Sequence, residues 1–140
     1  MTILVIDGQG GAIGSQMVKR LLAEFPQTEI LAVGTNSIAT ASMLKSGAIH
    51  ASTGENAVMT CAKRADIIVG PIGIVLADAL MGEVTPKMAK AVGRAKASRV
   101  LIPVSKCDTL IAGVSTVPMS VLIEDAMGKI RTLLGNPVNV

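Results

Sequence analysis

Short apolar segments alternate with amphipathic segments along the whole of this 140-residue chain. The apolar segments are rich in Ile, Val and Leu, as in strands buried on both faces, and between them apolar residues recur at helical spacing. Strands separated by helices in this way form βαβ units, in which the strands pair in parallel and the helices cover both faces of the sheet. The sequence therefore predicts a single-domain, Rossmann-like α/β fold over residues 1–140, with a doubly wound, mostly parallel sheet of about five to six strands.

The expected elements follow from this periodicity. Strands are predicted over residues 3–6, 29–33, 48–51, 66–69 and 99–104, with a possible last strand over 110–114. Helices are predicted over residues 13–25, 39–45, 55–63, 74–81, 85–95 and 118–134. Because ligands of doubly wound sheets bind at the carboxyl ends of the strands, a site is expected in the segments that follow them: residues 7–14, 34–40, 52–56, 70–73 and 105–109.

Composition excludes several classes of function. The chain has one Phe and no Tyr or Trp, which rules out a tyrosyl acid or base and leaves little aromatic surface for stacking bases. Its net charge is +3, and Lys and Arg are scattered, with no run longer than two. Because a nucleic-acid-binding face normally carries a denser basic stripe, we expect no nucleic-acid partner.

Cysteine usage and hydropathy indicate the compartment. Cys61 and Cys107 are too far apart for a paired metal motif, and two cysteines are too few for a disulfide framework. The most apolar stretch, residues 67–81, contains Gly70, Pro71 and Gly73 and is too broken to span a bilayer. Without a basic leader before the first strand, we expect a cytoplasmic protein with reduced thiols, no metal and no membrane contact.

The most specific motif is a glycine-rich loop between the first strand and the first helix. Glycines there let the backbone turn tightly and approach a phosphate, while the free N–H groups of the helix start donate to it. The candidate cofactor-binding residues in this loop are Gly8, Gln9, Gly10, Gly11, Ala12, Ile13 and Gly14. The alternative is a tight turn that needs glycine for packing alone. Asp7 would repel a bare phosphate, and we expect it to cap the loop rather than to hold magnesium.

A second candidate region follows the second strand, at Thr35, Asn36 and Ser37. The NAD fingerprint places an acid that binds the ribose about 20 residues beyond the glycine loop, but Thr35 stands 21 residues after Gly14 and no acid is present. Neutral donors would tolerate a 2′-phosphate, so NADP or another phosphorylated nucleotide is the expected cofactor. Alternatively, Asn36 and Ser37 form only a turn and a helix cap.

The first half of the chain resembles nucleotide-dependent epimerases and short-chain dehydrogenases. The resemblance rests on the glycine loop, on Thr53-Gly54-Glu55 before a helix and on the strand 66–69, and it covers roughly residues 1–75. It implies that Gly70, Pro71, Ile72 and Gly73 pass beside a nicotinamide ribose. The Tyr-x-x-x-Lys pair of those enzymes is absent, because the chain has no Tyr.

Few residues are candidates for catalysis. Lys106 and Cys107 follow the fifth predicted strand, where a Cys near a Lys can have a lowered pKa. Glu55 follows the third strand, but first-turn placement in a helix explains it more simply, with Thr53 or Asn56 as the cap. His50 is the single histidine and has no partner in the sequence, and Cys61 is interpreted as a core residue.

The segment 72–84 is apolar apart from Asp78 and Glu83. It could be a lid over the ligand or a contact between subunits of a homo-oligomer. The simpler interpretation is a core helix.

Several separate strings resemble a bacterial family of small Rossmann-like proteins described only as a domain of unknown function. They span nearly the whole chain: residues 6–11, 34–40, 53–57, 70–74 and 82–86. This resemblance implies the fold and no activity. The leading hypothesis is a small protein that binds a nucleotide such as NADP. The alternatives are an NAD(P)-dependent oxidoreductase completed by another subunit, and a non-enzymatic sensor or interaction subunit.

Overall fold

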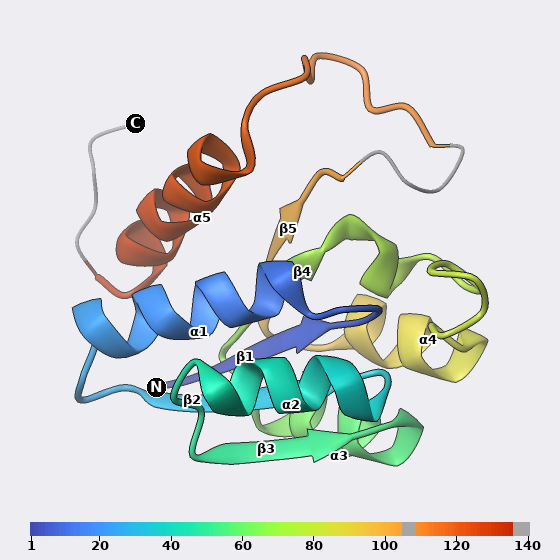
Figure 1. The fold of residues 1–140 in the computed structure, drawn as a ribbon, viewed down its shortest axis with the longest axis horizontal. Coiled ribbons are helices and arrows are strands. Elements are labelled where there is room, and N and C mark those ends of the chain that lie inside the picture. Colours follow the sequence, from blue (N-terminus) through green and yellow to red (C-terminus); the bar gives the residue numbers. More distant parts are fainter. Residues whose placement is uncertain (105–108, 136–140) are drawn as a thin grey trace.

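The structure, a computed structural model, describes residues 1–104 and 109–135. In this part of the chain five parallel strands form one sheet in the order β3-β2-β1-β4-β5 (Figure 1). The strands are β1 (Thr2–Asp7), β2 (Glu29–Gly34), β3 (His50–Thr53), β4 (Ile67–Pro71) and β5 (Ser98–Ile102). The chain reverses its direction across the sheet between β1 and β4, and a doubly wound fold has its ligand crevice at such a point.

Helices cover both faces of the sheet. They are α1 (Ala12–Glu24), α2 (Ser37–Lys45), α3 (Glu55–Arg64), α4 (Pro86–Arg94) and α5 (Met119–Leu133), with a short 3-10 helix, η1 (Ile72–Val75). The buried residues of α1, α2 and α5 pack in one core cluster, and those of α3, α4 and η1 pack in another on the opposite face. The predicted Rossmann-like, doubly wound α/β fold is therefore confirmed.

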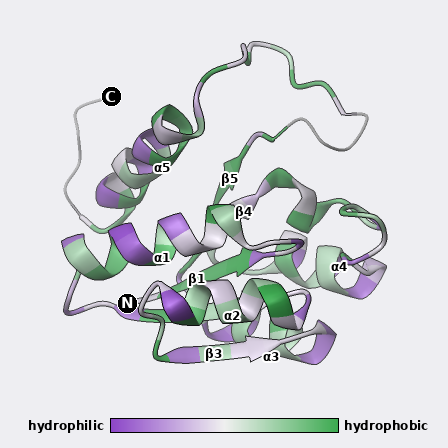
Figure 2. Cartoon of the chain, in the orientation of Figure 1, coloured by the Kyte–Doolittle hydropathy of each residue, from purple (hydrophilic) through white to green (hydrophobic). Residues whose placement is uncertain are grey.

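The central strand β1 divides its side chains between the two cores. Ile3 and Val5 point into the α1 side, while Leu4 and Ile6 point into the α3 side. All four are at most 1% exposed, and Figure 2 shows the hydrophobic colour of β1 between its polar ends, Thr2 and Asp7. Full burial of such a side chain stabilises the fold by about 1.5–3 kcal/mol, and this holds the loop after β1 in a fixed position.

The predicted helix over residues 74–81 is wrong. After η1 the chain turns repeatedly, and Asp78, Leu80, Met81 and Gly82 all have positive φ. These turns bury Ala79 and Leu80 against the α3 side of the sheet and leave Met81 96% exposed. Tertiary burial overrides the local helical pattern here, so the core-helix interpretation of residues 72–84 is also wrong.

The possible strand over residues 110–114 is wrong as well. This stretch contains a turn at residues 112 and 113 and lies in the exposed connection from β5 to α5. Leu110 is 94% exposed, because the sheet ends at β5 and offers this apolar run no partner. The third strand forms two residues later than predicted, at His50–Thr53.

A prediction concerns Gly70, which lies inside β4. A Cβ added there would meet the backbone oxygen of Ile6 at 2.2 Å, so Gly70→Ala should lower the free energy of unfolding by about 1–3 kcal/mol. The matched control is Gly128→Ala in α5, where the nearest atom is 3.9 Å away and the gain in helix propensity should be roughly 0.5–1 kcal/mol. Denaturant unfolding of both variants tests this, and equal effects would contradict the close approach.

Candidate functional site

Three loops meet at the carboxyl ends of β1 and β2, and one carboxylate joins them. Glu83 Oε1 accepts hydrogen bonds from the backbone N–H of Gln9 at 2.9 Å, the hydroxyl of Thr35 at 2.8 Å and the amide of Asn36 at 2.6 Å. We call these four residues the Glu83 cluster. It brings together the glycine-rich loop, the loop after β2 and the loop after β4, so it lies where the fold places ligands.

Asn36 has a second task in this cluster. Its Oδ1 accepts from the backbone N–H of Ala39 at 2.9 Å, which caps α2, and its Nδ2 also donates to the carbonyl of Gln9 at 3.0 Å. The helix-cap interpretation of Asn36 is thus confirmed. Ser37 is the first residue of α2 and is exposed.

Asp7 closes the base of the glycine-rich loop. It is 5% exposed, and its two oxygens accept from the backbone N–H groups of Gly8 at 2.8 Å and Gly14 at 2.6 Å. Asp7 therefore caps the loop as expected, and it uses one of the amides at the start of α1 that a phosphate would otherwise occupy.

The pKa values of the two carboxyl groups, Asp7 and Glu83, shift in opposite directions. Burial raises the pKa of Asp7, and the amides of Gly14, Gly8 and Ile13 offset this only in part. Burial also acts to raise the pKa of Glu83, but the hydrogen bonds from the cluster outweigh it, and the pKa lies below its ordinary value. Glu83 is therefore a carboxylate at neutral pH.

Close packing accounts for three of the four glycines of the loop. A Cβ would meet Thr35 Oγ1 at 2.5 Å if placed on Gly8, Ala39 Cα at 2.9 Å on Gly11 and Met43 Sδ at 2.7 Å on Gly14.

Gly10 differs from them. It is exposed, its φ is not positive, and nothing lies within 4 Å of an added Cβ. Among the described residues, the N–H groups of Gly10 and Ala12 have no hydrogen-bond acceptor. Gly10 is therefore the loop position with room for a ligand.

The segment 70–73, at the end of β4 and the start of η1, is covered by the chain itself. Gly70, Pro71 and Gly73 are buried, and a Cβ on Gly73 would lie 3.4 Å from Ala79 and 3.7 Å from Leu80. Ile72 is half-buried. These residues thus form the base beneath residues 79–80 and do not line an open floor in this structure.

The weaker catalytic candidates do not gather at one point in the described residues. Glu55 is half-buried at the first turn of α3, and His50 is exposed on β3. Lys106 and Cys107 lie outside the described residues. Gly54 is the N-cap of α3 without a side-chain cap, so the expected cap by Thr53 or Asn56 is wrong. Thr53 Oγ1 is instead bonded to Thr40 Oγ1 at 2.7 Å.

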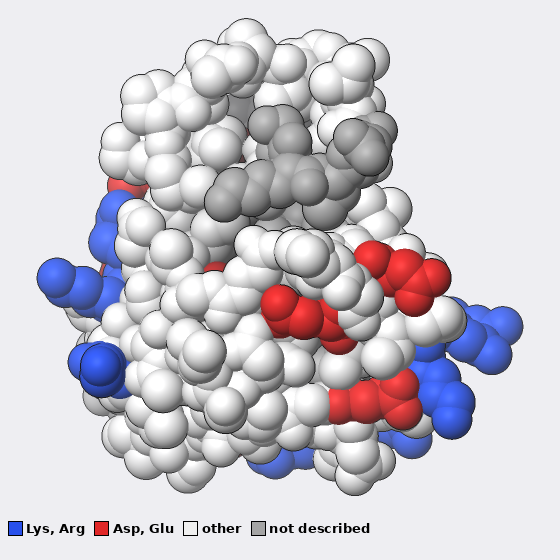
Figure 3. Space-filling model, turned by 45° about the vertical axis from the view of Figure 1, so that its right-hand side comes forward, with Lys and Arg blue, Asp and Glu red and all other residues white. Residues whose placement is uncertain are grey.

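Sequence reasoning missed Glu83 as a site residue. The signal was an acid within an otherwise apolar segment, followed by the cap and proline that open α4. Figure 3, turned so that the right-hand side of Figure 1 comes forward, shows acidic side chains close together on this side of the molecule. In the ranges 1–104 and 109–135, no three His, Cys, Asp or Glu residues are grouped to hold a metal ion. No helix in these ranges is long and apolar enough to cross a membrane.

The family model described as domain of unknown function DUF3842 matches residues 2–135. The chain belongs to this family. The predicted resemblance to a family of unknown function is thereby confirmed, whereas the likeness of the first half to short-chain dehydrogenases stays a prediction. No curated protein matches the DUF3842 chain.

Among solved structures, a similar one is the dodecameric FMN-dependent UbiX-like decarboxylase from Escherichia coli O157:H7. The two chains are 20% identical with a TM-score of 0.49, and the match covers 95% of this chain and 76% of the other.

A prediction concerns the acceptor role of Asp7. In Asp7→Asn the amide of the new side chain faces at least one backbone N–H, because both carboxylate oxygens are acceptors. A buried donor left unpaired should cost about 1–3 kcal/mol of unfolding free energy. The control is Asp125→Asn, whose exposed ion pair with Lys129 should contribute less than about 0.5 kcal/mol. Equal stabilities in urea titrations would show that Asp7 does not hold the loop.

Proposed function

We propose that this protein binds a nucleotide at the carboxyl edge of β1 and β2, with the ribose held by Glu83 and a phosphate beside Gly10. The observation that carries the proposal is the Glu83 cluster. In Rossmann folds that bind NAD, a carboxylate at the end of the second strand accepts hydrogen bonds from the ribose hydroxyls. Here the loop after β4 supplies a carboxylate to that place, next to Thr35 and Asn36.

The free oxygen of Glu83 defines the class of ligand. Oε1 accepts three hydrogen bonds, whereas Oε2 accepts none from the described residues. A carboxylate oxygen held in this way can accept from a sugar hydroxyl. It would repel a 2′-phosphate. The proposed ligand therefore has an unphosphorylated ribose, as in NAD, AMP or ATP, in contrast to the NADP expected from the neutral residues after β2.

The phosphate would lie over the open side of the glycine-rich loop. The N–H groups of Gly10 and Ala12 are free to donate there, at the positive end of the α1 dipole. Asp7 offsets part of that positive charge from below. Phosphate binding is therefore expected to be weaker than in a loop without a buried acid, and the ribose contacts contribute more of the specificity.

The enzymatic alternative and the sensor alternative both place the ligand at the same carboxyl edge. An oxidoreductase would need a reacting group near the cofactor, and the candidates are Glu55 in α3 and Lys106 or Cys107. Glu55 follows β3, next to the strand whose loop joins the Glu83 cluster. No hydrogen bond or ion pair in the described residues connects Glu55 to that cluster, so nucleotide binding without an assigned reaction is the function that the geometry supports best.

A prediction tests the loop through Gly10→Ala. Because the added methyl group meets no protein atom within 4 Å, the variant should be as stable as the parent but should lose affinity at least about tenfold, through contact with the ligand. Thermal shift against NAD, NADP, AMP, ATP, FMN and FAD measures both effects. At 100 times its dissociation constant a ligand should stabilise the parent protein by about 2.7 kcal/mol.

Two outcomes would contradict the loop assignment. No shift with any of the six compounds would mean that the crevice does not bind these nucleotides. A shift of equal size in parent and Gly10→Ala would mean that the ligand does not approach the loop.

A prediction for Glu83 concerns the direction in which its replacement changes nucleotide affinity. Glu83→Ala should weaken the best nucleotide at least about tenfold, because charge-assisted hydrogen bonds to ribose are lost. The matched control is Asp78→Asn, an exposed acid of the same loop at positive φ, which Asn tolerates. Its affinity should change less than about twofold. Isothermal titration gives the affinities, and NADP titrated in parallel should bind Glu83→Ala better than the parent.

Tighter binding of the unphosphorylated nucleotide by Glu83→Ala would overturn the ribose role. That result would mean that the carboxylate occupies the place of the ligand and must be displaced. Circular dichroism and a melting curve for each variant separate these outcomes from loss of the fold.

A further inference from the structure

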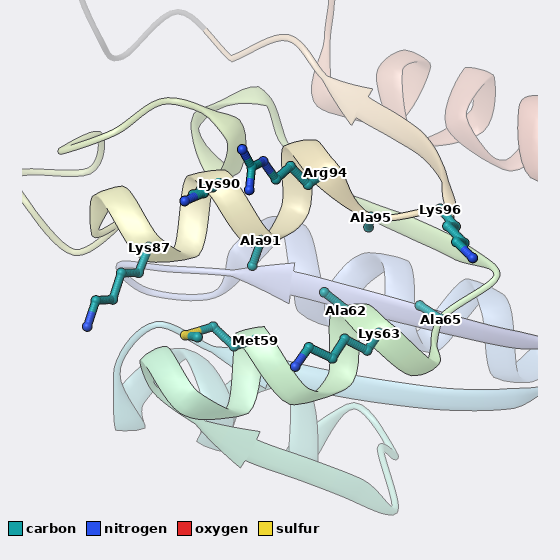
Figure 4. Close-up of a pocket in the computed structure, with 10 residues that line it drawn as sticks. All are labelled: Met59, Ala62, Lys63, Ala65, Lys87, Lys90, Ala91, Arg94, Ala95 and Lys96. Carbon is teal, nitrogen blue, oxygen red and sulfur yellow. The ribbon is translucent and has the colours of Figure 1, made fainter.

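A groove runs between α3 and α4, and its lining includes no residue of the Glu83 cluster. Its volume is about 660 Å³, and most of its surface is apolar. Alanines contribute much of its floor, with Met59 at one side (Figure 4). The floor alanines are Ala62, Ala65, Ala91 and Ala95. Small side chains let another backbone come close, and in this groove they lie on two neighbouring helices and at the C-caps of these helices.

Cations surround this floor. The ten lining residues include five Lys or Arg and no acid: Lys63, Lys87, Lys90, Arg94 and Lys96. Figure 4 shows Lys87 and Lys96 toward opposite ends of the groove, with Lys63 on α3 and with Lys90 and Arg94 on α4. The chain has 13 Lys and Arg in all, so more than a third of them border one groove.

None of these five cations forms an ion pair with a described residue. Other cations behave differently, since Arg64 in α3 pairs with Glu29 at 2.9 Å and Arg20 in α1, on the other face of the sheet, pairs with Glu124. Like charges three or four residues apart on one helix destabilise it, and Lys87, Lys90 and Arg94 follow that spacing. The groove therefore keeps a positive charge that nothing in the described fold offsets.

We propose that this groove docks an acidic amphipathic helix of a partner protein. An apolar stripe of that helix would contact the alanine floor, and Glu or Asp on both flanks would face the lysines and Arg94. Lys87 to Arg94 spans about 10 Å of helix axis, which corresponds to roughly two turns of a docked helix. Helix-in-groove recognition uses this combination of an apolar stripe and charged flanks.

The backbone of the groove favours a helix over an extended segment. The walls are α3 and α4, whose peptide groups are bonded within the helices, and the groove lining includes no strand edge. An extended segment would leave its own N–H and C=O groups unpaired over the alanines, whereas a helix pairs them internally.

The shape and charges also decide against other occupants. A protein surface that binds a membrane inserts protruding apolar side chains into the lipid. In this groove the apolar side chains are mostly short alanines, which lie below the longer cationic side chains. A second copy of this chain would need an acidic helix face. The acids of α5, Glu124 and Asp125, are already paired with Arg20, Arg131 and Lys129 within the molecule.

The experiment uses the full chain and two synthetic peptides of about 15 residues, long enough for partial helix formation. One peptide carries Leu and Ala at helical spacing with Glu on both flanks. The other has the same composition with the Leu residues scattered. In fluorescence anisotropy at about physiological salt, the first peptide should bind at least about tenfold more tightly than the second, because screening weakens the purely electrostatic part.

Charge-reversal variants locate the binding. Lys90→Glu combined with Arg94→Glu should weaken the amphipathic peptide at least about tenfold. The matched control reverses Lys19 and Lys45, exposed lysines of α1 and α2 on the other face of the sheet, and should change affinity less than about twofold. Ala91→Trp, which fills the groove without a change of charge, should weaken binding to a similar degree. Circular dichroism establishes that each variant is folded.

Three results would overturn the proposal. These are equal binding of both peptides, equal losses in the Lys90/Arg94 and Lys19/Lys45 variants, and binding to phosphatidylglycerol vesicles without binding of the amphipathic peptide. Sedimentation of the chain alone provides a further test, because self-association that is lost in the Lys90/Arg94 variant would assign the groove to a second copy. Nucleotide affinity is measured in the same variants and should not change. Failure of the groove proposal can therefore be distinguished from failure of nucleotide binding at the carboxyl edge.

Discussion

The arrangement of the carboxyl edge depends on one oxygen atom, Glu83 Oε1. It accepts from a backbone amide of the first loop and from two side chains of the second, while Glu83 itself belongs to a third loop. Each bond alone would contribute modestly in water, but bonds to a charged acceptor are stronger and hold their donors in fixed directions. The sheet places these loops near one another, and Glu83 determines how they meet.

In many glycine-rich loops a bound anion accepts hydrogen bonds from the loop amides. Here two acids of this edge accept such bonds instead. Asp7 accepts from amides below the loop, and Glu83 accepts from the Gln9 amide within it. The loop is therefore already organised around negative charge before any ligand arrives. A ligand that adds a second anion at the same atoms would be repelled, whereas one that offers hydroxyl donors to Glu83 and a phosphate to the outer amides complements the charge already present.

The strands and most helices could be predicted because apolar periodicity is local and the core requires it. β1 and α1 differ from their predicted bounds by one residue or so at each end, as expected for helix and strand ends. The site could be predicted only in part. Thr35 and Glu83 are 48 residues apart, and spacing along the chain does not reveal such a pair. A search for an acid about 20 residues beyond the loop fails because the acid beside Thr35 comes from the connection between η1 and α4.

The distribution of charge in the fold also could not be predicted from spacing along the sequence. In the sequence the Lys and Arg residues look scattered, and the net charge is only +3. In the fold, five cations that are spread along the sequence from Lys63 to Lys96 surround one groove. Asp7 and Glu83 lie at the carboxyl edge. A small net charge thus conceals two regions of opposite sign. Since electrostatic complementarity governs encounter and orientation, a nucleotide and an acidic partner would be directed to different surfaces, and each could bind without competing for the other's contacts.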